Sequence, residues 1–303
     1  TIDYWIGKYS SHCCFFMNPK TMLSTKEKFG EVETPNCLVQ KMTGLCKESK
    51  LRNKATRILD VGSGRGRIGL AIAEKISMYG VNNKVVGIEI QERHHKYVSK
   101  THSDKINSIH GDFVTHQFNE PFDLIIGNLP FNNDGLKTVP TNSNKKATTS
   151  KTIWPRLVKR ALTLLAPDGQ LVCITPALWM KKDKAGIHEL LTCYGGELKV
   201  YAFSAGETNK LFRGKAQTPV TLFSYYPAGE SSIHIYDQDK KRFIVYPKTS
   251  PYSSLPMCEI PLITTLQSLV KRDGCMPVIK TRVIKTGVGP GRTAQYQYPN
   301  VST

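Results

Sequence analysis

Acidic residues are scarce in this sequence: 24 Asp and Glu stand against 42 Lys and Arg in 303 residues, a formal net charge of +18. Such an excess disfavours an enzyme that handles only small molecules and favours a polyanionic partner, with nucleic acid as the leading candidate. A membrane surface is disfavoured because no amphipathic basic helix accompanies the charge. The charge alone does not separate DNA from RNA, since both present a phosphate backbone.

Paired cysteines and long apolar runs are also missing. The eight cysteines form no Cys-x-x-Cys pair and show no zinc-like spacing to histidine, so we expect no metal site. They favour reduced thiols and a place in the cytoplasm. No apolar run approaches membrane-spanning length, no signal-peptide pattern opens the chain at Thr1, and we expect no membrane partner. A first residue other than Met is compatible with a processed chain or a fragment.

The most informative stretch begins with a short apolar run, Leu124–Ile126, which predicts a buried strand. The tetrapeptide Asn128-Leu129-Pro130-Phe131 follows. Asn128 offers a side-chain carbonyl, and Pro130 biases Leu129 toward an extended conformation that directs the Leu129 carbonyl. Phe131 offers a flat apolar face. These groups suit an exocyclic amine on a planar heterocycle, held in position to attack an electrophile. The alternative is an ordinary turn with a buried Phe131.

A glycine loop follows another predicted strand. Residues 57–62 read as a buried strand that leads into Gly62–Gly66, and a helix is expected over about 67–79. Glycine lets the backbone approach a ligand closely. The spacing Gly64-x-Gly66-x-x-Gly69 also satisfies the dinucleotide fingerprint, so a nicotinamide-dependent oxidoreductase is an alternative. That alternative explains neither the tetrapeptide nor the charge.

Acidic residues mark three successive predicted strands. Asp60 belongs to the first, Glu89 ends the second over 84–90, and Asp112 follows the third over 106–110. Because ligands bind at the carboxyl ends of such strands, we expect the three carboxylates to converge on one crevice. Taken singly, each is more often a solvated strand-end residue.

Two motifs carry a resemblance to a known family. The tetrapeptide resembles the (Asn/Asp/Ser)-Pro-Pro-(Tyr/Phe) motif of amino-group methyltransferases that use S-adenosylmethionine. Upstream of the glycine loop, Gly30–Pro35 resembles the N-terminal cofactor motif of γ-class DNA adenine-N6 methyltransferases, the TaqI-like group, and Thr175–Trp179 also favours DNA. Leu129 replaces the first Pro, and this variant form is also seen in ribosomal-RNA adenine dimethyltransferases. The resemblance covers residues 29–226.

The resemblance implies a Rossmann-like α/β fold, with a seven-stranded methyltransferase sheet that ends in an antiparallel hairpin over 197–203 and 220–226. It divides the chain into an N-terminal packing segment over 1–28, a methyltransferase domain over 29–226 and a small C-terminal region over 227–303. Strand patterns within 233–246 predict a hairpin in that last region. By its position after the catalytic domain, we expect this region to recognise the target or to bind a partner subunit.

The resemblance also implies roles for individual residues. Catalysis is expected at Asn128, Leu129, Pro130 and Phe131, where a flipped-out adenine presents its N6 amine. Thr34 is predicted to cap a helix whose first residue is Pro35. S-adenosylmethionine is expected to contact the following residues: Phe29, Thr34, Pro35, Asp60, Gly62, Gly64, Glu89, Ile90, Asp112, Phe113 and Asn128.

Basic residues follow the fourth, fifth and sixth predicted strands, where they would surround the mouth of the pocket. We expect them to contact the phosphate backbone of DNA. A solvated face is the alternative explanation. The residues are Lys145, Lys146 and Lys151 in an expected loop over 132–152, Lys181 and Lys182 after 170–176, and Lys210, Arg213 and Lys215 in a polar connection before 220.

Three further functions stay open from the sequence. Leu129 favours an RNA adenine-N6 methyltransferase, and glutamine-amide protein methyltransferases use an Asn-Pro-Pro-Tyr site. A catalytically silent nucleic-acid-binding subunit would keep the fold beside an active partner. The intact set of Asp60, Glu89 and Asp112 argues against the silent subunit.

Overall fold

The computed structural model describes residues 32–131, 152–216, 218–247 and 254–273. The chain divides into two compact units, Thr1–Ile260 and Pro261–Thr303. The first is built on one sheet, and the described part of the second belongs to helix α9 (Ile260–Asp273). The predictions on segment 1–28, Phe29, Lys145, Lys146 and Lys151 lie outside the described residues.

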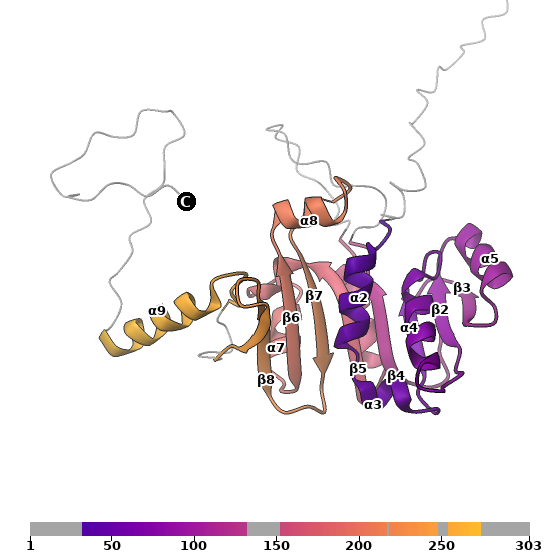
Figure 1. Ribbon diagram of the computed structural model, residues 1–303, viewed down its shortest axis with the longest axis horizontal. Coiled ribbons are helices and arrows are strands. Elements are labelled where there is room, and N and C mark those ends of the chain that lie inside the picture. Colours follow the sequence, from indigo (N-terminus) through magenta and orange to yellow (C-terminus); the bar gives the residue numbers. More distant parts are fainter. Residues whose placement is uncertain (1–31, 132–151, 217, 248–253, 274–303) are drawn as a thin grey trace, which may run out of the picture. The chain divides into compact units, whose positions relative to one another are not determined.

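A mostly parallel sheet forms the centre of the first unit (Figure 1). Within the described residues its strands are β1 (Ile58–Val61), β2 (Val85–Glu89), β3 (Ile106–His110), β4 (Phe122–Asn128), β5 (Leu165–Pro176), β6 (Glu197–Phe203), β7 (Val220–Tyr226), β8 (Ser232–Asp237) and β9 (Arg242–Val245). Their order is β3-β2-β1-β4-β5-β7-β6-β8-β9. β7 runs antiparallel to both β5 and β6, so the predicted antiparallel hairpin over 197–203 and 220–226 is confirmed.

The sheet has nine strands in the described residues, not the predicted seven, because the β8–β9 hairpin continues it. β8 pairs in parallel with β6, beginning at Glu197↔Ser232, and β9 pairs antiparallel with β8. Ile233 and Ile235 of β8 are buried in the core. Burying these side chains requires β8 to extend the sheet. The predicted division of the chain after residue 226 stays a prediction.

Helices cover both faces of the sheet: α2 (Asn36–Leu45), α3 (Glu48–Arg52), α4 (Arg67–Ser77), α5 (Glu92–Thr101), α6 (Trp154–Thr163), α7 (Ile187–Thr192), α8 (Ala205–Leu211) and the 3-10 helix η1 (Ala177–Met180). Apolar side chains of α2 and α4 pack with Ile126 on one face, and those of α6 and α7 pack with Ile125 on the other. Successive strand residues point to opposite faces, so β4 is buried on both. Figure 1 shows α2 in front of the sheet.

Two local elements differ from the sequence predictions. The expected polar connection after β6 contains α8, which begins with a capping box: Ser204 Oγ accepts from Glu207 N, and the Glu207 carboxylate accepts from Ser204 N. β5 begins at Leu165, earlier than the predicted 170–176, and its register against β4 shifts between Leu165 and Gln170. No helix of the described residues is long and apolar enough to span a membrane.

Candidate active site

The carboxyl ends of β1 and β2 bring the glycine loop to one edge of the sheet. The two strands pair in parallel up to Val61↔Ile88. Beyond β1 the amides of Gly62 and Ser63 donate to the Ile88 carbonyl at 3.0 and 3.1 Å. These bonds attach the loop to the end of β2. The loop therefore lies where open α/β sheets bind ligands.

Strand β4 ends at the tetrapeptide for a local reason. The Leu129 amide still donates to the Ile174 carbonyl of β5 at 3.3 Å, but Pro130 has no N–H and stops the ladder. The Leu129 side chain is buried in the core cluster beneath α6, whereas Phe131 is half-buried against the opposite cluster. The Phe131 carbonyl accepts from the Ile153 amide at 3.1 Å. The backbone is thus anchored on both sides of Pro130.

Asn128, the last residue of β4, is half-buried, and its amide group is held from one side. Nδ2 donates to Thr34 Oγ1 at 3.1 Å and to the Val32 carbonyl at 3.5 Å. Among the described residues, no group donates a hydrogen bond to Asn128 Oδ1 or to the Leu129 carbonyl. Within the described part of the chain, these two oxygens on consecutive residues therefore have no donor.

The glycine loop faces the tetrapeptide. Its backbone uses positive φ, +67° at Gly62 and +54° at Gly64, which favours glycine. A Cβ built on Gly62 would lie 3.8 Å from Pro130 Cδ, which is ordinary van der Waals contact. The Gly64 amide donates to Glu89 Oε2 at 2.8 Å, and the Gln91 amide donates to Oε1 at 2.8 Å. Glu89, itself buried, thus holds the loop against the end of β2.

Asp60 departs from the prediction that three carboxylates face one crevice. It is fully buried, and its Oδ2 accepts from the Gly69 amide of α4 at 2.9 Å, while Oδ1 has no hydrogen-bond partner among the described residues. Burial raises the pKa of Asp60 to about 7, opposed by the Gly69 hydrogen bond and assisted by the charge of Glu89. An enclosed carboxyl group in this place braces α4 against β1. Direct contact between Asp60 and a ligand is not provided by this geometry.

Other members of the predicted cofactor set are exposed, namely Gly62, Ile90 and Asp112. Ile90 is 48% exposed just beyond β2, and Asp112 follows β3, with its Oδ1 accepting from the Val114 amide at 2.9 Å. Phe113 is buried behind them. An open glycine backbone, an apolar side chain and a carboxylate can admit a methionine moiety, cover a flat ring and accept from an amine. The residues present therefore fit S-adenosylmethionine.

Two described residues of the N-terminal motif, Val32 and Thr34, contact Asn128, but the helix that follows begins later than predicted. α2 begins at Asn36 with Pro35 in the N-cap position, and no side chain caps it. Thr34 does not cap the helix, because its buried hydroxyl bonds to Asn128.

Arg67 was missed by sequence reasoning. Its guanidinium group forms an ion pair with Glu33 and donates to Asn36 Oδ1 at 2.7 Å. Because Arg67 is the first residue of α4, it joins the N-terminal motif to the glycine-loop helix. A charged residue opening a helix gives no periodic signal, so only the tertiary contact identifies it.

The described members of the predicted basic set are exposed: Lys181, Lys182, Lys210, Arg213 and Lys215. The first two follow η1 after β5, and the other three lie on or after α8, which follows β6. β4 and β5 are parallel, and β7 is antiparallel to β5 and β6, so these strands end at one edge. The basic residues thus lie on the same edge as Asn128. Their role in binding stays a prediction.

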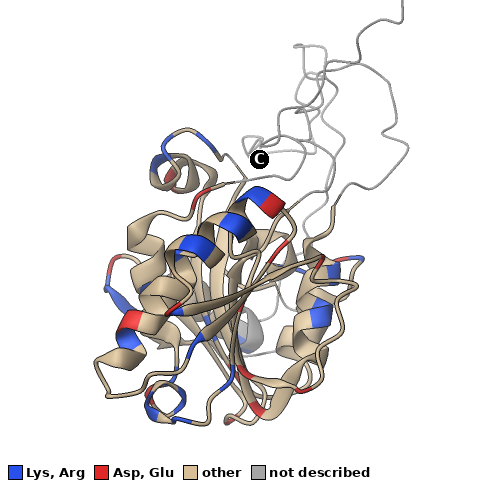
Figure 2. Ribbon diagram, turned by 90° about the vertical axis from the view of Figure 1, so that its right-hand side faces the viewer, with Lys and Arg blue, Asp and Glu red and all other residues tan. Residues whose placement is uncertain are grey.

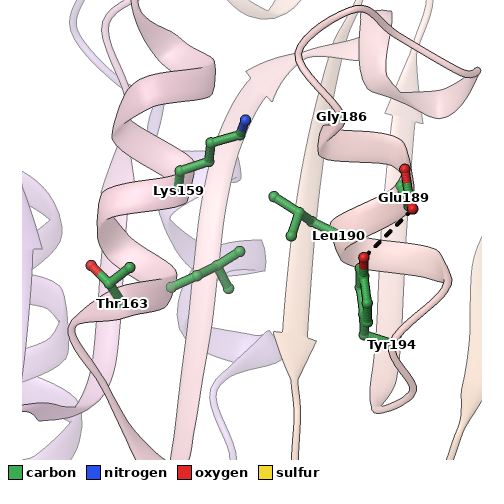
Figure 3. Close-up of a pocket in the computed structure, with 7 residues that line it drawn as sticks. Lys159, Thr163, Gly186, Glu189, Leu190 and Tyr194 are labelled. Carbon is green, nitrogen blue, oxygen red and sulfur yellow. Dashed lines mark hydrogen bonds between the residues drawn. The ribbon is translucent and has the colours of Figure 1, made fainter.

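A separate hollow of about 520 Å³ opens between α6 and α7 (Figure 3). Lys159 and Thr163 approach it from α6, Glu189 and Leu190 from α7, and the Tyr194 hydroxyl donates to Glu189 at 3.5 Å. None of its lining residues belongs to the predicted site.

Comparison with known proteins identifies a family for this chain. The model of the Eco57I restriction-modification methylase family matches residues 41–201, more than half of the chain. That range contains the glycine loop and the tetrapeptide, whereas Thr34 and the basic residues of α8 lie beyond it.

Two curated relatives match over most of the chain. A tRNA1(Val) (adenine(37)-N6)-methyltransferase from Pedobacter heparinus is 25% identical over 191 residues, covering 61% of this chain and 77% of that protein. The type II methyltransferase M.TthHB8I from Thermus thermophilus is 26% identical over 205 residues, covering 64% of this chain and 44% of that protein. Against further tRNA1(Val) methyltransferases the chain spans about half of their length.

A solved structure shares the fold. It belongs to a Listeria monocytogenes protein assigned to the class I S-adenosylmethionine-dependent methyltransferases, with a TM-score of 0.50 and 14% identity over 80% of this chain and 71% of the other. The predicted α/β fold with a parallel-rich sheet is therefore confirmed.

Proposed function

This chain belongs to the Eco57I restriction-modification methylase family, and from that premise we propose that it transfers a methyl group from S-adenosylmethionine to the N6 amine of adenine in DNA. A family of restriction-modification enzymes favours DNA as the substrate. The relative from Pedobacter heparinus, which acts on adenine N6, supports the acceptor atom. The motifs at 30–35 and 128–131 support a place among γ-class, TaqI-like enzymes, with the first Pro of the second motif replaced by Leu129.

The pair of available oxygens at the end of β4 carries the proposal. An adenine N6 amine has two N–H donors, and Asn128 Oδ1 and the Leu129 carbonyl receive no donor from the described residues. Two acceptors on consecutive residues match two donors on one nitrogen. The glycine loop lies in contact range of Pro130, so an acceptor held by the tetrapeptide would adjoin the proposed cofactor residues.

The chain contributes orientation and electrostatics. S-adenosylmethionine, when bound, supplies an electrophilic methyl group. Asn128 Oδ1 and the Leu129 carbonyl accept the two N–H groups of the amine, which concentrates the lone pair on the nitrogen. Phe131 covers one face of the adenine ring. In-line positioning of the nitrogen provides a large part of the acceleration. The nitrogen lone pair would form the new N–C bond as the sulfonium–methyl bond breaks, with the electron pair of that bond left on sulfur, and the nitrogen would then release one proton to solvent.

The target adenine leaves the base stack to reach this edge, because N6 inside a duplex is engaged in base pairing. Lys181, Lys182, Lys210, Arg213 and Lys215 then neutralise the phosphates that flank the extruded nucleotide. Sequence recognition belongs to other contacts, since phosphate contacts carry no direct sequence information. The region over 227–303, or a partner subunit, is the proposed source of those contacts.

A second candidate is adenine N6 in RNA. Two observations favour it: the tRNA1(Val) methyltransferases among the relatives, and Leu129, which gives the tetrapeptide the form seen in ribosomal-RNA adenine dimethyltransferases. RNA loops expose unstacked adenines without extrusion from a duplex.

A substrate comparison separates the candidates. The purified chain is incubated with isotope-labelled cofactor and either genomic DNA free of N6-methyladenine or unmodified transcribed tRNA and rRNA. Digestion to nucleosides and mass spectrometry should reveal N6-methyladenine in the DNA. Label in RNA alone would replace the proposal with the second candidate. No transfer to either, together with no cofactor binding by calorimetry, would indicate a silent subunit and overturn both.

A further inference from the structure

Asn128 is contacted by two residues that precede it by more than 90 positions. Its Nδ2 lies 3.1 Å from Thr34 Oγ1 and 3.5 Å from the Val32 carbonyl. A backbone carbonyl only accepts hydrogen bonds, so the atom that faces Val32 is the NH₂ group of the amide. The N-terminal motif therefore selects one of the two possible amide orientations and directs Oδ1 to the opposite side.

We propose that Thr34 is a positioning residue for Asn128. Its hydroxyl accepts from Asn128 Nδ2 and thereby keeps Oδ1 turned toward the target amine. The inference rests on the proposed function, in which Oδ1 accepts one N–H of adenine N6. Without the Thr34 hydroxyl, only the longer contact of Nδ2 with the Val32 carbonyl, at 3.5 Å, opposes exchange of the oxygen and nitrogen ends, because the terminal torsion of Asn is broad and roughly two-fold. After this exchange the Nδ2 hydrogens of Asn128 face the N–H hydrogens of the adenine amine, and the hydrogen bond between Asn128 and the amine is lost.

The surroundings of Thr34 suit this role. The residue is 6% exposed, so the bond to Asn128 is shielded from competing water. Its β-branched side chain has few rotamers and holds Oγ1 in place. Arg67 bonds to the side chains of Glu33 and Asn36, which lie on either side of Thr34 in the chain. The orientation of Asn128 is thus connected to the helix that follows the glycine loop.

A contact between Thr34 and the cofactor is a different role, and the two separate kinetically. Removal of a cofactor contact weakens cofactor binding, and excess cofactor restores the rate. Removal of the group that orients Asn128 lowers kcat, and excess cofactor does not restore it.

The kinetic test uses three variants. Thr34→Val keeps the shape and removes the hydroxyl, Thr34→Ser keeps the hydroxyl, and Thr43→Val is the matched control. Thr43 is a half-buried residue of α2 whose hydroxyl donates to the Gln40 carbonyl of the same helix at 3.0 Å. At saturating cofactor and nucleic acid, kcat of Thr34→Val should fall about 10- to 100-fold, as for other residues that orient a group in contact with the substrate. Thr34→Ser should recover most of the rate, and Thr43→Val should match the unmodified chain. An unchanged kcat in Thr34→Val would overturn the inference.

A second measurement does not depend on activity. The two Nδ2 protons of Asn128 are assigned in the NMR spectrum of the full chain by their disappearance in Asn128→Ala. In Thr34→Val their resonances should move and exchange faster with water, and in Thr43→Val they should not change. Unchanged resonances in Thr34→Val would overturn the inference even where methyl transfer is observed. If no nucleic acid accepts a methyl group, the proposed function fails, and the NMR result still decides whether Thr34 holds Asn128.

Discussion

Basic residues lie near both ends of strands β5 and β6, and the two ends differ in whether these residues form ion pairs. At the amino ends the residues are paired: Lys50 lies 2.6 Å from Asp168, and Lys47 lies 2.9 Å from Glu197. Hydrogen bonds from Lys50 and Tyr226 hold the pKa of Asp168 below its usual range. These ion pairs attach α3 and the residue before it to the sheet.

At the carboxyl ends, Lys181, Lys210, Arg213 and Lys215 are exposed and form no ion pair with any described residue. The nearby acidic side chains accept hydrogen bonds from backbone amides instead. Asp183 accepts from the His188 amide at 2.8 Å, and Glu207 takes part in the α8 capping box. Figure 2 shows Lys and Arg, in blue, at both ends of the sheet. The difference teaches that the number of basic residues is less informative than their pairing. Near the carboxyl ends of β5 and β6 we propose that the exposed charge contacts a polyanion, whereas Lys47 and Lys50 near the amino ends stabilise the fold through their ion pairs.

The largest effect should come from the end of β4. Asn128→Ala removes one of the two proposed amine acceptors, and kcat should fall by about 100- to 1,000-fold, the usual decrease for one preorganised polar contact. Cofactor affinity by calorimetry should stay close to that of the unmodified chain. The matched control is Asn53→Ala at the amino edge, whose side chain accepts only from the Ala55 amide at 2.9 Å. Equal decreases in kcat for Asn128→Ala and Asn53→Ala would contradict a catalytic role that is specific to the carboxyl end of β4.

The next effect concerns nucleic-acid binding. Replacing Lys210, Arg213 and Lys215 together with Ala should lower affinity at physiological salt and reduce the slope of log K against log salt by about 0.7–0.9 for each phosphate that is no longer neutralised. The control changes the same number of charges at the opposite edge, at Lys54, Lys84 and Lys105, all exposed. Binding titrations at several salt concentrations check both. Equal slopes of log K against log salt in the two triple variants would show that nucleic-acid binding does not depend on where these charges lie on the protein.

A third prediction concerns stability and pH at the buried acid of the site. Folding raises the pKa of Asp60 to about 7, so between about pH 4 and 7 the unfolded chain loses this proton while the folded chain keeps it. The contribution of Asp60 to stability therefore declines as pH rises through that window and is constant above it. Asp60→Asn should flatten the decline in a denaturant series. The same pH profile in both proteins would contradict the enclosed, proton-binding position of Asp60.

The smallest effect is expected at the paired edge. Asp168→Asn leaves Lys50, whose side chain is 10% exposed, without its anionic partner. The free energy of unfolding should fall by about 1–2 kcal/mol with kcat unchanged. The control is Asp104→Asn, an exposed acid before β3. If Asp168→Asn folds fully but loses activity, a catalytic role at the amino ends of the strands would be indicated, which contradicts the proposed site.

Much of the fold was readable from the sequence because β1 and β4 are buried on both faces, and apolar residues mark them at Ile58, Leu59 and Leu124–Ile126. The glycine loop and the tetrapeptide follow these strands with residues of distinctive chemistry. The contact of Thr34 with Asn128 and the contacts of Arg67 with Glu33 and Asn36 were not readable, since they join segments far apart in the chain. The burial of Asp60 was missed because its sequence position matches that of an exposed strand-end acid. The Ser204-x-x-Glu207 signal for α8 was present, but the helix is too short for apolar periodicity.

The account depends most on one claim, that the end of β4 presents adenine N6 to a methyl donor. The direct measurement supplies cofactor with a deuterated methyl group to the unmodified chain and to Asn128→Ala, and then identifies the labelled nucleoside by mass spectrometry. The account predicts deuterated N6-methyladenine from the unmodified chain and a decrease of at least about 100-fold from Asn128→Ala. Label on another base or another atom, or full yield from Asn128→Ala, would contradict it.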